Sequence, residues 1–241
     1  MSDGIAARLA AVRERVARAA ERAGRRPDEV ELVGVAKLHS AGAVVDAVRA
    51  GLGAVAENYA QEAQAKIPEV LQRLAAEARL PPRWHFVGRL QRNKARAVAR
   101  LFDVVETIDA VGLGAELDRR AAALGRRLEV LLQVNLSGEA QKGGVPPEAL
   151  LDLIEASSAW RAIEPVGLMT IPADSPDPEA SRSTFARLRE LLEKTPATPR
   201  GGRLRELSMG MSNDFELAIE EGATIVRVGT AIFGARGEEG T

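Results

Sequence analysis

Residues 31–37 have the sequence ELVGVAK, a short β-branched strand that ends in a lysine. Similar short runs recur along the 241-residue chain, separated by segments rich in Ala, Leu, Glu and Arg. Strands that alternate with helices pair in parallel, and eight such units can close a barrel. The predicted strands are 31–36, 52–56, 84–88, 104–108, 129–135, 165–170, 205–208 and 224–228.

The length of the chain favours one barrel, because about 250 residues is typical of a TIM barrel. We therefore predict a single α/β domain over residues 1–241, folded as a (β/α)8 TIM barrel with an extra N-terminal helix. One face of that helix would be lined by Ile5, Leu9, Val12 and Val16. An open doubly wound sheet is the rival architecture, since the same alternation of strands and helices permits it.

Residues that end or begin helices support the division into strands and helices. Gly51, Gly125 and Gly222 each follow a helical run, where a left-handed residue commonly ends a helix. Asn213 followed by Glu216 predicts a capping box at the start of a helix.

The composition excludes several classes of function. With 33 basic and 34 acidic residues the net charge is −1, so the chain has no general attraction to nucleic acid or to anionic membranes. The basic residues between 89 and 100 are interpreted as a solvated helix face, because no aromatic residues are interleaved with them. No segment reaches the ~18 apolar residues of a membrane span. We expect a cytoplasmic protein without nucleic-acid or membrane partners.

Cysteine and metal chemistry are also excluded. The chain has no cysteine, so it can form neither disulfides nor thiolate sites. His39 and His85 are its two histidines, and neither lies at a metal-ligand spacing. We assign no metal ligand and no catalytic residue.

The functional site of a closed barrel lies at the carboxyl ends of its strands. Lys37 follows the first predicted strand directly. An apolar strand behind a lysine removes part of its solvent, which lowers its pKa and frees the amine to attack an aldehyde. The alternative is a lysine that only extends from a strand end into water.

The last two predicted strands lead into loops suited to phosphate. Residues 208–212 read SMGMS, and Gly229 and Thr230 follow the eighth strand. Backbone N–H groups and hydroxyls in the loops after strands seven and eight commonly bind phosphate in barrels. Glycine permits close approach of the backbone. Alternatively, Gly210 and Gly229 only form turns.

Arg227 interrupts the apolar run 224–228. A charged residue inside a strand covered on both faces needs a partner or a ligand. Arg227 is therefore predicted to face a ligand, and a salt bridge to a carboxylate of the barrel remains the alternative.

Seven segments make the chain similar to the YggS/PROSC family of pyridoxal phosphate homeostasis proteins, over nearly its whole length. They are VGVAK (33–37), ENYAQE (57–62), WHFVG (84–88), LQRNK (90–94), GLMTIP (167–172), LSMGMS (207–212) and RVGTAIFGAR (227–236). The resemblance implies a barrel like the N-terminal domain of alanine racemase with pyridoxal 5′-phosphate as cofactor.

The resemblance also assigns roles to individual residues. Lys37 would hold the cofactor as an aldimine, Ser208, Gly229 and Thr230 would surround its phosphate, Arg227 would lie near the pyridine nitrogen, and Asn58 would lie beside the cofactor. The full predicted cofactor-binding set is Lys37, Asn58, His85, Met169, Ser208, Gly210, Arg227, Gly229 and Thr230.

The chain differs from the family at one lysine position and matches it at another. His39 stands where the family usually has a second lysine. Lys142 matches a family lysine after the fifth predicted strand, where it would either engage the cofactor during transfer or remain a solvated loop residue.

The resemblance implies a protein that holds pyridoxal phosphate reversibly and supplies it to apoenzymes, and we expect it to be a monomer. The alternative is a racemase-like enzyme. Racemases of this fold take a second base, a tyrosine, from an additional domain, whereas this chain ends at Thr241 and has Tyr59 as its one tyrosine. The resemblance therefore favours the carrier.

Overall fold

The computed structural model describes residues 2–139 and 142–235. Its strands close into a parallel barrel in chain order, with β1 paired to β8. Closure confirms the predicted α/β barrel and excludes the open sheet. The strands are β1 (Glu31–Val35), β2 (Ala54–Glu57), β3 (Arg83–Phe86), β4 (Val104–Ile108), β5 (Leu128–Gln133), β6 (Ile163–Met169), β7 (Glu206–Ser208) and β8 (Ile225–Val228).

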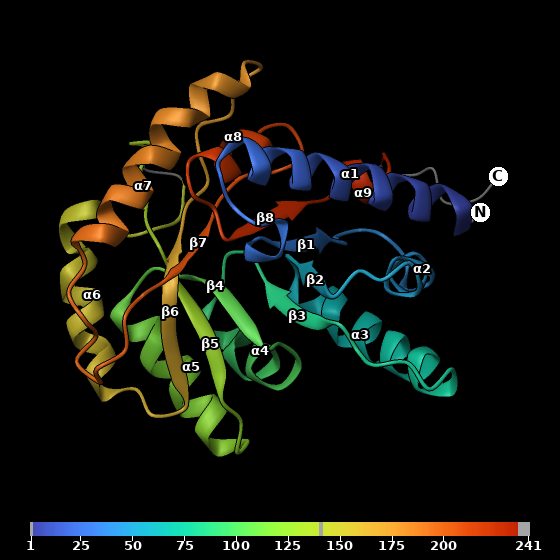
Figure 1. The fold of residues 1–241 in the computed structure, drawn as a ribbon. Coiled ribbons are helices and arrows are strands. Elements are labelled where there is room, and N and C mark those ends of the chain that lie inside the picture. The colour runs from blue at the N-terminus through green and yellow to red at the C-terminus, as the bar shows by residue number, and fades with distance from the viewer. Residues whose placement is uncertain (1, 140–141, 236–241) are drawn as a thin grey trace.

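Helices follow the strands and surround the barrel (Figure 1). The α-helices are α1 (Ser2–Arg22), α2 (Ala41–Arg49), α3 (Ala60–Ala76), α4 (Ala95–Leu101), α5 (Val111–Ala123), α6 (Leu150–Ala156), α7 (Arg182–Lys194), α8 (Phe215–Glu220) and α9 (Thr230–Phe233). Short 3-10 helices occupy Pro27–Glu29, Arg92–Lys94, Pro147–Ala149, Ser157–Ala159 and Pro178–Ser181. Within the described ranges, no helix is long and apolar enough to cross a membrane.

Glycines end the helices at the predicted positions. Gly51, Gly125 and Gly222 have φ values of 95°, 65° and 101°. The amide of Leu52 donates to the carbonyl of Ala47 over 3.0 Å, closing the turn after α2. That turn delays β2 to Ala54, two residues later than the sequence predicts.

The predicted capping box at α8 is wrong. The N-cap residue of α8 is Asp214, whose Oδ1 accepts a 2.7 Å hydrogen bond from the amide of Met211. Glu216 does not reach back to the helix start, because it forms a 2.9 Å ion pair with Arg15 of α1. A tertiary contact therefore replaces the local one.

The extra N-terminal helix is present and packs along α8 and α9 (Figure 1). Its apolar residues Ile5, Leu9, Val12 and Val16 are buried, as their spacing predicts. Two arginines of the same helix add polar contacts: Arg15 lies 4.6 Å above the ring of Phe215, and the guanidinium of Arg8 donates to the carbonyl of Ile232 over 2.8 Å. The helix thus stabilises the segment that follows β8.

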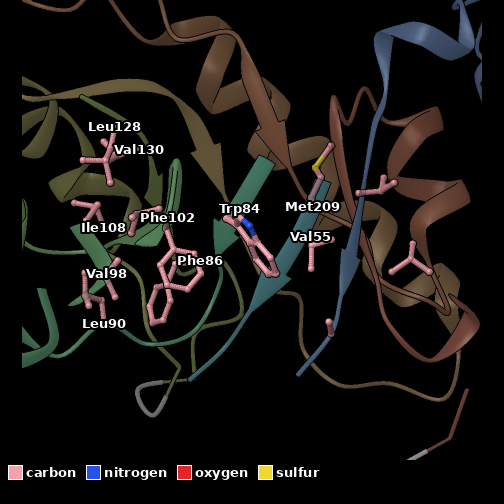
Figure 2. Packing of buried hydrophobic residues seen from close by; sticks show 14 of the residues in the cluster. Val55, Trp84, Phe86, Leu90, Val98, Phe102, Ile108, Leu128, Val130 and Met209 are labelled. Atoms are coloured by element: carbon pink, nitrogen blue, oxygen red, sulfur yellow. The ribbon is translucent and has the colours of Figure 1, made fainter. Parts of the chain in front are cut away.

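The core has two parts. The larger part lies between the strands and the helices, where the rings of Phe86 and Phe102 meet edge to face at 5.2 Å (Figure 2). The smaller part fills the inside of the barrel and includes Val33, Ala54 and Leu131. In β2, β5 and β8, neighbouring residues contribute to different parts, as the two-residue period of a strand requires.

Candidate cofactor site

Lys37 leaves β1 at the carboxyl end of the barrel and is partly buried. The amide of Ala36 donates to the carbonyl of Ala56 on β2 over 2.9 Å. The amide of His39 donates to the carbonyl of Ala36 over 3.1 Å and closes the turn. Leu38 has a φ of 63°, a conformation that costs a branched side chain of order 1–3 kcal/mol. Lys37 therefore sits in a tight and strained turn.

A largely buried polar cluster supports this turn, and it was not predicted from the sequence. Lys66 of α3 donates to Glu57 over 2.8 Å, to Glu62 over 2.5 Å and to the carbonyl of Ala36 over 2.9 Å. Burial raises the pKa of Glu57 to about 7, against the opposing hydrogen bond and charge of Lys66. The sequence contains a signal for this cluster, because Glu57 is a charged residue within a strand covered on both faces and such a residue needs a partner.

The loops after β7 and β8 are joined to each other and lie beside β1. The amide of Arg227 donates to the carbonyl of Gly210 over 3.0 Å, and the amide of Gly229 donates to Ser212 Oγ over 3.2 Å. A Cβ placed on Gly229 would lie 3.3 Å from the carbonyl oxygen of Val35. The predicted residues Gly210, Gly229 and Thr230 are thus brought together near the strand that carries Lys37.

A second polar cluster lies inside the barrel and centres on Glu106 of β4, which the sequence analysis also missed. Glu106 Oε1 lies 2.7 Å from Nδ1 of His85, and Glu106 Oε2 accepts a 2.5 Å hydrogen bond from Ser208. Arg227 donates to Ser208 Oγ and, over 3.0 Å, to the carbonyl of Thr170. All four side chains of this network are buried.

Electrostatics in the barrel interior favour an ionised Glu106. Burial alone would raise the pKa of Glu106, but the hydrogen bond and charge of His85, with Arg227 and Ser208, hold it below the ordinary value. Burial lowers the pKa of Arg227, while the charges of Glu106 and Asp214 oppose this. The buried cation and carboxylate thus compensate each other.

The network gives three of the predicted site residues internal partners. The hydroxyl of Ser208, predicted to lie at the phosphate, is bonded to Glu106 and Arg227 inside the barrel. His85 is fully buried against Glu106. Arg227 has the carboxylate partner that was the alternative interpretation. The reason is register: each of these residues faces inward on its strand, and barrel closure brings them together.

Asn58 and Met169, two further residues of the predicted set, lie at the carboxyl ends of β2 and β6. Asn58 follows β2, and its buried Oδ1 has no hydrogen-bond partner among the described residues. Met169 ends β6 and is fully buried in the inner core. An unsatisfied buried amide oxygen next to the turn of Lys37 is the kind of group that a ligand satisfies.

The two other positions singled out in the sequence have defined surroundings. His39 is buried and stacks on Phe233 with 5.2 Å between ring centroids. Lys142 donates to the carbonyl of Pro172 over 3.0 Å and forms a 2.9 Å ion pair with Glu139. Lys142 is therefore anchored to the segment after β6. Over the described ranges, no three His, Cys, Asp or Glu residues gather as a metal site would require.

Comparison with known proteins gives a consistent result. Residues 7–237 match the family model described as "Alanine racemase, N-terminal domain". The pyridoxal phosphate homeostasis protein of Pseudomonas aeruginosa is 44% identical over 232 residues, which cover 96% of each chain. The protein of the same name from Escherichia coli K12 is 39% identical over 232 residues, covering 96% of this chain and 97% of that protein.

Solved structures agree with the sequence matches. PipY of Synechococcus elongatus with PLP bound is 37% identical, superposes with a TM-score of 0.79, and is matched over 95% of this chain and 100% of its own. Alanine racemase from Bartonella henselae is 15% identical with a TM-score of 0.68 over 100% of this chain and 61% of its own, and it shares the fold alone. The chain therefore belongs to the family of pyridoxal phosphate homeostasis proteins, built on the N-terminal domain fold of alanine racemase.

Proposed function

We propose that this protein binds pyridoxal 5′-phosphate reversibly at the carboxyl end of its barrel and acts in pyridoxal phosphate homeostasis. Its similarity to the PLP-bound PipY structure and to the named homeostasis proteins supports this function. The structural observation that carries it is the proximity of the loop at Gly229 to the end of β1, the strand that Lys37 follows, since β1 and β8 are paired neighbours.

The residues present fit this cofactor. Gly229 leaves room for close backbone approach, since a Cβ there would crowd Val35. Ser212 already accepts a hydrogen bond from the amide of Gly229, so we add Ser212 to Gly210, Gly229 and Thr230 as the residues that would hold the phosphate. The unsatisfied Oδ1 of Asn58 supplies a further polar contact.

When bound, pyridoxal phosphate supplies an aldehyde that a neutral lysine amine can bond covalently and a competing amine can displace. Lys37 would provide the amine. Arg227 would face the pyridine nitrogen, and its contacts with Ser208 and the carbonyl of Thr170 hold the guanidinium in one orientation. A permanent cation at that position disfavours protonation of the ring nitrogen, which suits storage better than carbanion chemistry.

A carrier without catalytic turnover is the form of this function that we propose. Tyr59, the one tyrosine of the sequence, lies just before α3 and is 51% exposed. A base that removes an α-proton is normally held within hydrogen-bond reach and away from bulk water. We further propose that residues 1–241 form one domain, that the protein is a cytoplasmic monomer, and that it supplies PLP-dependent apoenzymes.

The visible spectrum of the purified protein tests the binding proposal. The wild type is expected to be yellow or to become so with added pyridoxal phosphate, and borohydride is expected to fix the cofactor on Lys37, as located by peptide mass spectrometry. Lys37→Ala should show neither result. A wild-type protein that stays colourless with added cofactor would overturn the proposal.

Proton exchange separates the carrier from the racemase-like alternative. The loaded protein is incubated with L-alanine or L-serine in deuterated water, and the α-proton is followed by NMR. We expect no exchange beyond that produced by free pyridoxal phosphate at the same concentration. Exchange at catalytic turnover rates would exclude a pure carrier.

A further inference from the structure

The turn that carries Lys37 is held from outside the barrel by one helix. Lys66 Nζ donates to the carbonyl of Ala36 over 2.9 Å, and Glu62 Oε1 accepts from the amide of Leu38 over 2.8 Å. These two backbone groups flank Lys37 on either side. The two side chains are also bonded to each other, with 2.5 Å between Lys66 Nζ and Glu62 Oε1.

Lys66 and Glu57 are buried, Glu62 is partly exposed, and the three donors of Lys66 are fully used. The side chain of Lys66 is 7% exposed, and its three N–H groups match three acceptors, Ala36, Glu57 and Glu62. Glu57 is completely buried on β2. A salt bridge of this kind costs desolvation and is weak evidence for stability alone, so its geometry invites a functional explanation.

The strained residue is the one that the cluster restrains. Leu38 adopts a φ of 63° and is 56% exposed, so its own packing restrains this conformation only weakly. The hydrogen bond from its amide to Glu62 restrains it, together with the backbone bond between His39 and Ala36. Strain that persists at a functional position is normally imposed by surrounding structure.

We propose that Glu62 and Lys66 are positioning residues for Lys37: by fixing the carbonyl of Ala36 and the amide of Leu38 they hold the strained turn that presents the Lys37 amine to pyridoxal phosphate. This inference rests on the proposed function of Lys37. Glu62 and Lys66 act through the backbone and do not touch the cofactor.

The first test measures cofactor binding in Glu62→Ala and Lys66→Met. Both variants lose a contact with the turn, so we expect the dissociation constant for pyridoxal phosphate to rise about tenfold and the association rate to fall. Glu62→Gln keeps an oxygen for the amide of Leu38 and should lie between wild type and Glu62→Ala. Glu69→Gln breaks an exposed ion pair with Arg73 on the same helix and serves as the matched control with unchanged binding.

A rescue experiment distinguishes positioning from general stability. Glycine adopts a positive φ without strain, so Leu38→Gly removes the need for the restraint. The double variant Glu62→Ala with Leu38→Gly is expected to bind pyridoxal phosphate several-fold more tightly than Glu62→Ala. Folded single variants that bind with wild-type affinity and rate would overturn the proposal, as would the absence of any rescue.

Two measurements on the cofactor-free protein keep the test independent of the proposed function. Hydrogen exchange in the wild type should show a protected Leu38 amide, and an amide that exchanges at the unprotected rate would refute the restraint even if the variants fail to fold. Reductive methylation by formaldehyde and borohydride should modify Lys37 at a changed rate in Glu62→Gln, as followed by mass spectrometry. A wild type that binds no pyridoxal phosphate would overturn the proposed function. Hydrogen exchange and methylation would still test whether Glu62 and Lys66 restrain the turn.

Discussion

Glu106 and Arg227 form an ion pair across the inside of the barrel, with 3.7 Å between Oε2 and Nη1, although β4 and β8 are not neighbouring strands. Ser208 on β7 bridges them, since its hydroxyl donates to Glu106 and accepts from Arg227. The charge proposed to face the cofactor therefore has a fixed countercharge beneath it. This arrangement makes a buried carboxylate part of the architecture of the site.

Loss of that carboxylate should be costly. Glu106→Ala leaves Arg227 buried without its countercharge, and breaking one side of a buried ion pair typically costs about 3–5 kcal/mol. We expect a correspondingly lower midpoint in urea unfolding and weaker binding of pyridoxal phosphate. Glu116→Ala, which removes a partly exposed carboxylate paired with Arg119 and Arg120 on the surface of α5, is the control and should cost under ~1 kcal/mol. Equal midpoint shifts for the two variants would contradict this account.

The raised pKa of Glu57 predicts a pH-dependent stability. The pKa is about 7 in the folded protein against an ordinary value of 4.5, so the folded state binds the proton more tightly than the unfolded state. This contribution is complete below about pH 4.5 and is lost as pH rises through about 7, amounting to about 3 kcal/mol.

Glu57→Gln should remove that slope. Urea unfolding of wild type and Glu57→Gln between pH 4.5 and 8 measures it, because the difference in unfolding free energy isolates the titration of this group. The expected result is a wild type that loses stability relative to the variant as pH rises. A difference that does not change with pH would show that Glu57 titrates alike in both states.

Gly88 should not tolerate a side chain. A Cβ there would lie 1.9 Å from the backbone oxygen of Asn58, and a backbone atom cannot move aside cheaply. Gly88→Ala is expected to cost about 1–3 kcal/mol or more and to displace Asn58 from the site. Gly53→Ala, where a Cβ meets no atom within 4 Å, is the matched control and should leave the thermal midpoint nearly unchanged. Similar midpoints for both variants would refute the predicted clash.

Asn58 should matter for binding more than for folding. Its Oδ1 has no hydrogen-bond partner among the described residues, so Asn58→Ala removes no internal bond of that oxygen. We expect a change in unfolding free energy within about 1 kcal/mol and a dissociation constant for pyridoxal phosphate raised roughly five- to tenfold, which is about 1–1.4 kcal/mol. Titration calorimetry and urea unfolding check the two halves. A variant that loses stability but binds normally would assign Asn58 a structural role instead.

Much of the fold follows from local patterns. The eight strands appear in the sequence as short β-branched runs. No observed strand end differs from the predicted one by more than two residues. The errors have local causes, as when the turn after Gly51 delays β2 to Ala54. The capping box predicted at Glu216 failed because Arg15, two hundred residues away, offers a charged partner.

The sequence by itself determined the barrel, the place of Lys37 at the end of its first strand, and the glycine loops at Gly210 and Gly229, because strand period and turn chemistry are local properties. Only the tertiary structure decided that Ser208 and His85 bond to Glu106 inside the barrel and that Lys66 hydrogen-bonds the turn of Lys37. A strand pattern states which side of the sheet a residue faces. Which buried polar groups meet there depends on closure and register, and desolvation then obliges each of them to find a partner.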